Sequence, residues 1–504
     1  MSTETDSVQG PDGRLFRSLI RRVAADSANR DSLLADSHHE CPYSEIPGHI
    51  EELQSFLATS GVSQEDCLTL ELNNSVRAAL GVLALLDGGF SFMTMPVAGQ
   101  GARAGTDDIR YAKFSRWIVS VKTDKPTGPL TQTPASSYLS VRLNEAFDPA
   151  AVQPKVGAPR LFFRTSGSTG AAKLAVYSHR AFYLNSLNAL EVRGFNPTHR
   201  ITLPTPIFHV YGLGAGFLAG LAGGSSIDLQ ERSNILRFFE REAEFQPNIA
   251  YVTPSFCEML IRGRRRARLY EFMIVSGDRI SESTFRRCEE LHGPMINQYG
   301  ATELGVVAAS RLDMPLDLRC RTVGRLVKGV ESRIVALAAD QTGEAGELQI
   351  KHAFGFEGYV DLDGRELIPP KAFDGQWYRT GDLATAGPDG TLAVLGRCDL
   401  SVNRQGVLLP LAEVESRMRE LEGVEEVVVT AGPQNMRGRS LVAFCVLAPG
   451  FDITGPDLRA SYAKNAPSFS VPEEVCIMGV LPKLDSGKVD RQRLTKLANE
   501  VCSA

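Results

Sequence analysis

The sequence predicts an α/β protein with a large first part, a β-rich lobe and a small α+β unit near the end of the chain. Two observations lead to this prediction. Up to about residue 322, short apolar runs alternate with helix-like stretches, the pattern of buried parallel strands joined by helices. After residue 396, an acidic helical stretch, two strand-like runs and a last helix indicate a separate unit.

In the first part, helices are expected over Leu15–Ala25 and Val76–Leu86. The buried strands are expected over five apolar runs, Arg160–Arg164, Arg200–Leu203, Asn248–Val252, Phe272–Val275 and Met295–Gln298. Each run is followed by a Gly, Ser or Pro turn and then a helix-like stretch. Ligands of open α/β sheets bind outside the carboxyl ends of the strands. The turns SGSTG, TPIFH, TPS, SGD and YGATE are therefore the candidate binding turns.

Shorter strands separated by Gly and Asp turns predict the β-rich lobe over about 322–396, at Ser332–Leu337, Glu347–Ile350 and Thr391–Leu395. The final unit has predicted elements of both kinds: a helix over Leu411–Leu421, strands over Glu425–Thr430 and Leu441–Leu447, and a helix that begins at Asp490.

Composition excludes several classes of protein. The chain has 504 residues, and its 54 Lys and Arg against 59 Asp and Glu give a net charge of −5. This balance offers no argument for nucleic acid or anionic lipid as a partner. The nine cysteines are odd in number and form no CxxC pair, which favours free thiols in a reducing cytoplasm over a disulfide framework or a zinc site. We therefore expect a cytoplasmic protein that binds no nucleic acid.

Two segments bear on targeting. Residues 1–13 are polar and acidic, without the basic-then-apolar layout of a signal peptide, and are expected to be a disordered lead. Val210–Ile227 is uncharged over 18 positions, but it contains six glycines and two serines. A buried, tightly packed helix and turn fits this composition better than a membrane span.

The most informative segment is Phe163-Arg-Thr-Ser-Gly-Ser-Thr-Gly-Ala-Ala-Lys173. Its small residues let backbone N–H groups approach an anion, its hydroxyls add donors, and Lys173 supplies charge. It is not a Walker A loop, because Ala172 and Leu174 stand where that motif has glycine and Ser or Thr. Taken alone, the segment predicts either a phosphate-handling loop or a flexible linker.

The wider pattern of motifs resembles the ATP-dependent, AMP-forming ligases: acyl- and aryl-CoA synthetases, peptide-synthetase adenylation domains and luciferases. The similarity covers roughly residues 160–495. Besides the loop Thr165–Lys173, the matching segments follow in the family's order: Pro206-Ile-Phe-His209 with Gly212, Asn297-Gln-Tyr-Gly-Ala-Thr-Glu303, Val323-Gly-Arg325, Gly346-Glu347, Tyr378-Arg-Thr-Gly-Asp-Leu383, Gly396-Arg397-Cys-Asp399, Gly406 with Glu413-Val-Glu415, and Leu481-Pro-Lys-Leu-Asp-Ser-Gly-Lys488 with Arg491.

This resemblance implies an architecture and a reaction. The N-terminal adenylate-forming domain over 14–396 would contain two α/β subdomains and a β-barrel-like lobe, with a mobile α+β domain over 397–504 hinged near Asp399. The chain would resemble a stand-alone acyl- or aryl-CoA synthetase. With ATP and Mg²⁺ it would convert a carboxylic acid to an acyl adenylate, and coenzyme A would then displace AMP.

The resemblance also assigns site residues. The phosphates would lie against Thr165, Ser166, Gly167, Ser168, Thr169, Gly170 and Lys173, with Thr302 at the α-phosphate and Glu303 on Mg²⁺. A helix N-cap is the structural alternative for Thr302-Glu303. The nucleoside would lie against Gly277, Asp278, Tyr299, Gly300, Ala301, Asp382 and Arg397. The remaining assignments are Lys488 for adenylation, His209 as an aromatic gate, Gly406 beside the pantetheine arm and Asp399 as the hinge.

Some positions depart from the family pattern, and alternatives follow from them. The loop ends in Ala171-Ala172-Lys173-Leu174 where the family has Pro-Lys-Gly-Val, and Ser276-Gly-Asp-Arg-Ile280 lacks the usual Gly-Gly or Gly-Glu pair. His209 stands where amino-acid-activating domains have an aspartate, which favours a non-amino acid substrate. The alternatives are acyl transfer to a carrier protein's pantetheine, a protein that forms only the thioester from a supplied adenylate, and a non-catalytic nucleotide-binding relative.

Overall fold

The computed structural model describes most of the chain, namely residues 15–97, 111–122, 130, 133–151, 158–165, 173–230, 234–263, 267–337, 345–367, 373–404, 407–435, 438–482 and 489–502. It confirms the predicted α/β class. The chain divides into a first unit of residues 1–100, 107–330 and 352–370 and a second unit of 101–106, 331–351 and 371–504. The expected disordered lead, residues 1–13, lies outside the described residues. The domain boundaries expected at 396 and Asp399 stay a prediction.

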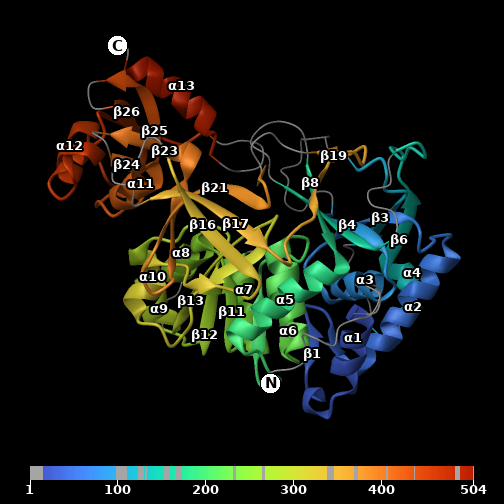
Figure 1. Ribbon diagram of the computed structural model, residues 1–504. Coiled ribbons are helices and arrows are strands. Elements are labelled where there is room, and N and C mark those ends of the chain that lie inside the picture. The colour runs from blue at the N-terminus through green and yellow to red at the C-terminus, as the bar shows by residue number, and fades with distance from the viewer. Residues whose placement is uncertain are drawn as a thin grey trace. The chain divides into compact units, whose positions relative to one another are not determined.

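A nine-stranded mixed sheet forms one layer of the first unit (Figure 1). Its central strands are parallel, and antiparallel strands stand at both ends. In spatial order they are β15 (Arg325–Leu326), β14 (Gly305–Ala309), β13 (Met295–Ala301), β12 (Phe272–Val275), β11 (Ile249–Val252), β9 (Arg200–Leu203), β10 (Ser226–Leu229), β1 (Leu33–Ala35) and β2 (Glu40–Pro42).

An eight-stranded sheet forms the second layer of this unit. Strands β7, β4, β3 and β5 are mutually parallel, and the outer strands pair antiparallel. In spatial order they are β19 (Glu366–Leu367), β18 (Gly358–Val360), β8 (Leu174–Ser178), β7 (Arg160–Arg164), β4 (Ser91–Pro96), β3 (Cys67–Leu72), β5 (Trp117–Val121) and β6 (Leu139–Leu143).

The segment after the glycine-rich loop corrects the sequence prediction. A helix-like stretch was expected to follow that turn, but the loop joins β7 directly to β8, its antiparallel partner. All five residues of β8 are buried, and β8 pairs with β18 on its other side. A run with no polar face satisfies its backbone best inside a sheet. The next helix starts only at His179.

Helices cover both sheets of the first unit. All twelve residues of α3 are buried, so this helix lies wholly in the interior. Aromatic residues of α7, α8 and α9 pack against β11, β12 and β13 in one hydrophobic cluster. The helices are α1 (Leu15–Ala25), α2 (Ile46–Thr59), α3 (Val76–Asp87), α4 (Ala135–Tyr138), α5 (His179–Arg193), α6 (Ala219–Ala222), α7 (Ile235–Phe245), α8 (Pro254–Gly263), α9 (Glu282–His292) and α10 (Leu316–Arg321).

The uncharged segment Val210–Ile227 is the buried, tightly packed helix and turn that its composition predicts. It contains a π-helix, η5 (Tyr211–Leu218), followed by α6. A Cβ on Gly216 would come within 2.7 Å of the Leu203 side chain, and one on Gly220 within 2.9 Å of Ile201, so glycine permits the close approach to β9. In the part of the chain that the structure describes, no helix has the length and apolarity to cross a membrane.

The second unit contains two five-stranded sheets. One is formed by β16 (Val330–Ala336), β17 (Gly346–His352), β20 (Phe373–Asp374), β21 (Trp377–Ala386) and β22 (Leu392–Arg397). The other is formed by β23 (Ser401–Arg404), β24 (Val407–Pro410), β25 (Val424–Asn435), β26 (Gly438–Leu447) and β27 (Glu474–Ile477). Helices α11 (Leu411–Arg419), α12 (Gly455–Ala463) and α13 (Arg491–Val501) pack on the second of these sheets. The Asp490 side chain caps α13, as the sequence predicts.

Candidate functional site

Predicted site residues of the first unit follow parallel strands at one edge of the nine-stranded sheet. Gly277 and Asp278 follow β12, Tyr299 lies near the end of β13, and His209 follows β9. The carboxyl ends of these strands meet at the same edge, because β13, β12, β11 and β9 are consecutive and parallel. This is the edge at which α/β sheets bind ligands. Gly277 has a φ of +95°, a conformation that favours glycine.

Thr302 and Glu303 lie in a hairpin turn, not at a helix N-terminus. Strand β13 continues through Tyr299 to Ala301 and pairs antiparallel with β14, with a register shift at Tyr299 and Gly300. The turn YGATE therefore begins later than predicted, after Ala301. A Cβ on Gly300 would lie only 2.2 Å from the Gly305 carbonyl oxygen, so the tight crossing at this bulge requires glycine. The capping interpretation of Thr302-Glu303 is thereby excluded.

A buried asparagine on α5 holds this hairpin. The Asn185 amide donates to the Leu304 carbonyl at 2.8 Å, and its oxygen accepts from the Val306 N–H at 3.1 Å. His352 lies beside it, donating from Nε2 to the Val306 carbonyl at 3.1 Å and accepting at Nδ1 from Phe354 N–H at 3.0 Å. Burial lowers the pKa of His352 to about 4, so this ring is neutral near neutral pH.

Two tyrosines of the eight-stranded sheet connect the hairpin with the flank of the glycine-rich loop. Tyr177 on β8 donates to the Thr302 carbonyl at 2.8 Å, and Tyr359 on β18 donates to Glu303 Oε1 at 2.7 Å. The Lys173 Nζ lies 5.9 Å from the centroid of the same Tyr359 ring. Lys173 of the glycine-rich loop and Thr302 and Glu303 of a second motif thus gather around two neighbouring strands.

The base of the glycine-rich loop is closed by a backbone hydrogen bond. The Thr165 N–H donates to the Lys173 carbonyl at 3.0 Å. Leu174, one of the departures from the family pattern, is fully buried and packs with Phe162 and Val176 in a hydrophobic cluster. The leucine at this position therefore packs in the hydrophobic core beside the sheet. Part of the loop lies outside the described residues, including the predicted phosphate-binding residues Ser166, Gly167, Ser168, Thr169 and Gly170.

His209 lies on the surface of the first unit, between β9 and the π-helix. Its ring is exposed, with its centroid 4.4 Å from that of Phe208. The turn that presents it needs glycine at position 212, where a Cβ would come within 2.1 Å of the Pro206 carbonyl oxygen. Asp278 is likewise exposed, and its carboxylate accepts from the Arg279 N–H at 2.7 Å.

In the second unit, Asp382 and Arg397 stand directly opposite each other on β21 and β22. The Arg397 guanidinium donates to Asp382 Oδ1 at 3.1 Å, to the Thr380 carbonyl at 2.8 Å and to Asp399 Oδ1 at 3.3 Å. Burial lowers the pKa of Arg397, but the Asp382 and Asp399 carboxylates raise it overall. Gly381, with φ +69°, lets the guanidinium approach, since a Cβ there would lie 2.7 Å from Nη2. Gly406 and Lys488 lie outside the described residues.

The three residues that hold the first-unit site were not predicted from the sequence. Asn185 is an ordinary helix residue in the sequence, and Tyr177 and Tyr359 are aromatic residues in apolar strands. In the sequence, each is marked only as a polar group within an apolar stretch, and this pattern does not show which residue it will hydrogen-bond. Residues 262–268 contain five arginines. Among those that the structure describes, Arg268 donates to the Pro247 carbonyl and packs over Tyr270, so its contacts are structural.

Comparisons with known proteins identify the family. A family profile described as AMP-binding enzyme matches residues 20–360, and one described as AMP-binding enzyme C-terminal domain matches residues 413–488. The chain therefore belongs to the AMP-binding enzyme family, as its motifs predict.

Relatives and solved structures agree with this assignment. The chain is 25% identical to a salicylyl-CoA synthase / salicylate adenylyltransferase from Streptomyces sp, over 92% of this chain and 90% of that protein. It is 25% identical to an indoleacetate–CoA ligase from Aromatoleum aromaticum, over 90% of this chain and 92% of the relative. Among solved structures, ATP-bound MatB from Rhodopseudomonas palustris superposes with a TM-score of 0.76, at 21% identity, over 96% of this chain and 99% of the other. At this identity the structural similarity establishes the fold.

Proposed function

We propose that this protein is an acid–thiol ligase that converts a carboxylic acid, not an amino acid, to its coenzyme A thioester through an acyl adenylate. The observation that supports this best is the grouping of Lys173, Thr302 and Glu303 around Tyr177 and Tyr359. A cation at the flank of a glycine-rich loop and a fixed carboxylate are the groups that a nucleoside triphosphate and its metal require. The acid–CoA ligases among its relatives support the same reaction class.

The proposed reaction has two halves. In the first, a carboxylate oxygen of the acid forms a bond to the α-phosphorus of ATP, and pyrophosphate leaves. In the second, the thiol sulfur of coenzyme A forms a bond to the acyl carbon, the thiol proton is released, and AMP leaves. Lys173 and Lys488 would offset the charge of the phosphates and of the reacting carboxylate, and the Thr302 hydroxyl would donate to the α-phosphate.

Glu303 fits a site for Mg²⁺. Its carboxylate is partly exposed, is fixed at Oε1 by the Tyr359 hydroxyl, and offers the hard oxygen ligand that Mg²⁺ prefers. When bound, the ion would supply charge neutralisation on the triphosphate. The protein's own contribution to this site is to orient the Glu303 carboxylate through the Tyr359 hydrogen bond.

The second unit would contribute to the nucleoside and to the change between half-reactions. We assign Asp382 to the ribose hydroxyls, with Arg397 beside it, because this carboxylate is held in place by a guanidinium on the neighbouring strand. Asp399 would be the hinge of a mobile C-terminal domain, and the pantetheine arm of coenzyme A would lie beside Gly406. Both follow from the family pattern. The nine cysteines are all free, which fits a reducing compartment such as the cytoplasm.

Two alternatives share the fold and most of the site. The acyl group of the adenylate could pass to the pantetheine of a carrier protein in place of free coenzyme A. The protein could also form only the thioester, from an adenylate made elsewhere, for which the Ala171-Ala172 and Leu174 departures near the loop are the motive.

ATP–pyrophosphate exchange with Mg²⁺ tests the first half-reaction. The purified chain is offered pooled fatty, aryl and polycyclic acids without a thiol, and we expect exchange above the blank that lacks acid. Dividing the pool identifies the acid, and adding coenzyme A or a carrier protein with its pantetheine arm identifies the acceptor. The Lys488→Ala variant is the control, since it should lose exchange without losing the fold.

If no exchange is observed, a second assay separates the alternatives. A preformed acyl adenylate for each acid is then supplied with coenzyme A. Thioester formed there supports the protein that performs only the second half-reaction. If neither exchange nor thioester is formed by the wild-type chain, while ATP still binds, the proposed ligase activity is wrong and the non-catalytic relative is favoured.

A further inference from the structure

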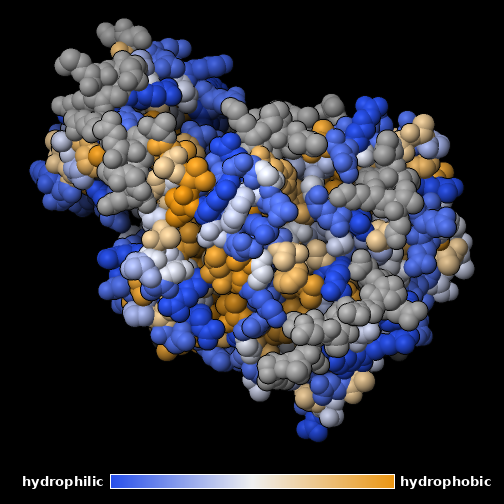
Figure 2. Space-filling view, viewed as in Figure 1, coloured by the Kyte–Doolittle hydropathy of each residue, from blue (hydrophilic) through white to orange (hydrophobic). Residues whose placement is uncertain are grey.

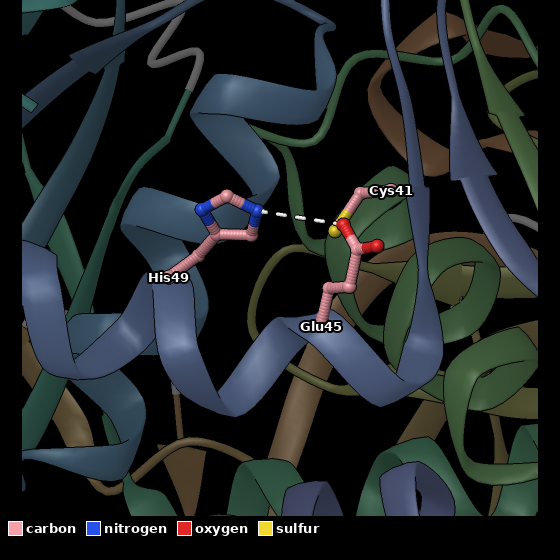
Figure 3. Close-up of side chains that lie close together, drawn as sticks. All are labelled: Cys41, Glu45 and His49. Carbon is pink, nitrogen blue, oxygen red and sulfur yellow. Dashed lines mark ion pairs between the residues drawn. The ribbon is translucent and has the colours of Figure 1, made fainter. Parts of the chain in front are cut away.

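A group of potential metal ligands lies away from the predicted nucleotide-binding residues of the first unit. Cys41 is on β2, Glu45 ends the short helix η3 (Tyr43–Glu45), and His49 is on α2. Their sulfur, carboxylate oxygen and ring nitrogen atoms all lie within 4.8 Å of one another. Figure 3 shows the His49 ring and the Glu45 carboxylate turned toward each other, with the Cys41 sulfur beside the carboxylate. Among the described residues, no other three His, Cys, Asp or Glu donors gather this closely.

The ring nitrogen of His49 gives independent support for a ligand here. His49 is only 7% exposed, and its Nε2 makes no hydrogen bond within the described structure. Glu45 Oε2 is 4.0 Å from this nitrogen, beyond hydrogen-bond distance. A buried ring nitrogen without a partner is unfavourable, and a missing ligand is one explanation for such a group. This nitrogen is aimed at the other two donors (Figure 3).

The donor set selects the class of cation. A thiolate, an imidazole and a carboxylate are the ligands of zinc, whereas Mg²⁺ prefers oxygen alone. Glu45 and His49 are four residues apart at the start of α2, so both side chains lie on one face of the helix. Since 43% of the Glu45 side chain is exposed, water can reach the group from that side.

We propose that Cys41, Glu45 and His49 bind one zinc-class divalent cation. On binding, the Cys41 S–H bond breaks, its proton passes to solvent, and a sulfur–metal bond forms. Zinc–ligand distances of about 2.0–2.3 Å bring donors to about 3.5 Å apart, so the exposed Glu45 side chain would swing inward by about 1 Å. Cys41 and His49 are buried, so Glu45 has the most freedom to adjust.

The cation would be structural. Strand β2 is the end strand of the nine-stranded sheet, where Cys41 pairs with Leu34 of β1. A metal bonded to Cys41 and to His49 would fasten this edge strand to α2. No residue of the proposed ligase reaction takes part, so the cation should not be needed for adenylate formation.

Spectroscopic titration tests the proposal on the full chain. Metal-free protein is titrated with Zn²⁺ against a chromogenic chelator in excess Mg²⁺, and separately with Co²⁺. We expect one Zn²⁺ per chain, and with Co²⁺ a thiolate-to-metal charge-transfer band with intense tetrahedral d–d bands. Cys41→Ser should abolish the charge-transfer band, and His49→Gln should weaken binding at least ~10-fold.

Matched variants make the test decisive. Cys476→Ser and the exposed His38→Gln should bind Zn²⁺ like the wild type, and Glu303→Gln should too, which separates this site from the proposed magnesium site. Far-UV circular dichroism identifies any variant that fails to fold. If one of the two ligand variants, Cys41→Ser or His49→Gln, does not fold, the other still tests the proposal. The proposal is overturned if wild-type protein binds no stoichiometric Zn²⁺, if it shows no thiolate band with Co²⁺, or if folded Cys41→Ser and His49→Gln variants bind as the wild type does.

Discussion

Two carboxylates are assigned to the proposed ATP site, Glu303 to Mg²⁺ in the first unit and Asp382 to the ribose in the second, and they are held in different ways. The hairpin of Glu303 is held by Asn185, Tyr177 and Tyr359, which are 119–125 or 56 residues away in sequence from the groups that they bond. Asp382 is held by Arg397, only 15 residues away on the next strand. Asn185 is buried, whereas 49% of the Arg397 side chain is exposed.

This difference sets how much each support should matter. Removing one partner of a buried hydrogen bond leaves the other without water or protein, which is costly. Removing one partner of an exposed ion pair leaves a charge that water solvates, which costs little. The first unit should therefore be sensitive to substitutions and pH at its site, and the second should tolerate them. Hydrophilic residues cover much of the face in Figure 2, with the apolar residues in patches between them.

Mild acid, at about pH 5, should destabilise the first unit more than the second. All eight histidines lie in the first unit, and burial lowers the pKa of His179 to about 3 and that of His352 to about 4. Below about pH 6.5 the unfolded chain binds protons that the folded chain does not, so stability is complete above that pH and falls as the pH drops toward 4 and 3. At about pH 5 we expect a loss of about 2 kcal/mol per histidine, about 4 kcal/mol together.

The two tryptophans allow this measurement unit by unit, because Trp117 lies in the first unit and Trp377 in the second. Urea unfolding of each single-tryptophan variant, followed by fluorescence at neutral pH and at about pH 5, gives the two free energies. His179→Leu is the control and should remove about half of the acid effect. Equal acid loss in both units would contradict the comparison.

Asn185→Ala should cost the first unit about 3 kcal/mol of unfolding free energy at neutral pH, because the buried Leu304 carbonyl and Val306 N–H each lose a partner. The matched variant is Asn188→Ala. Asn188 lies on the same helix and makes one hydrogen bond, to the Lys328 carbonyl at 2.8 Å. This substitution should cost about 1 kcal/mol. Denaturant unfolding followed at Trp117 measures both. Similar losses for the two variants would show that Asn185 does not hold the hairpin.

Glu303→Gln should lower ATP–pyrophosphate exchange about 100-fold, or ~2.7 kcal/mol, with little change in stability, because the charge on the proposed metal ligand is lost. Tyr359→Phe keeps the ring that Lys173 packs over and removes only the hydroxyl that orients the carboxylate. It should cost about 10-fold and raise the Mg²⁺ concentration for half-maximal exchange. A Tyr359→Phe variant with unchanged Mg²⁺ dependence would leave Tyr359 without a positioning function.

The same difference explains what could be predicted from the sequence. The class of fold and most buried strands were evident, since the apolar runs 160–164, 200–203 and 272–275 match β7, β9 and β12. The proposed site residues were found where they stand in glycine-rich or charged motifs. Strand β8 was missed because its pairings, with β7 across the loop and with β18 far along the chain, are not evident from its own five residues. Asn185, Tyr177 and Tyr359 were missed for the same reason: their partners are remote, and a single buried polar residue does not name its partner.

Arg397→Gln should have the smallest effect on stability. Arg397 and Asp382 form an exposed cross-strand pair, and such pairs contribute about 0–1 kcal/mol. Arg333, in the same sheet, pairs with Asp374, whose side chain is more exposed than that of Asp382 (66% against 17%), so Arg333→Gln is a control for the loss of one surface arginine. Both variants should unfold in urea within about 1 kcal/mol of the wild type when followed at Trp377. Only Arg397→Gln should raise the KM for ATP in the exchange assay, because only Arg397 positions the carboxylate assigned to the ribose. If both variants raised that KM equally, the effect would come from the general charge of the sheet and not from Asp382.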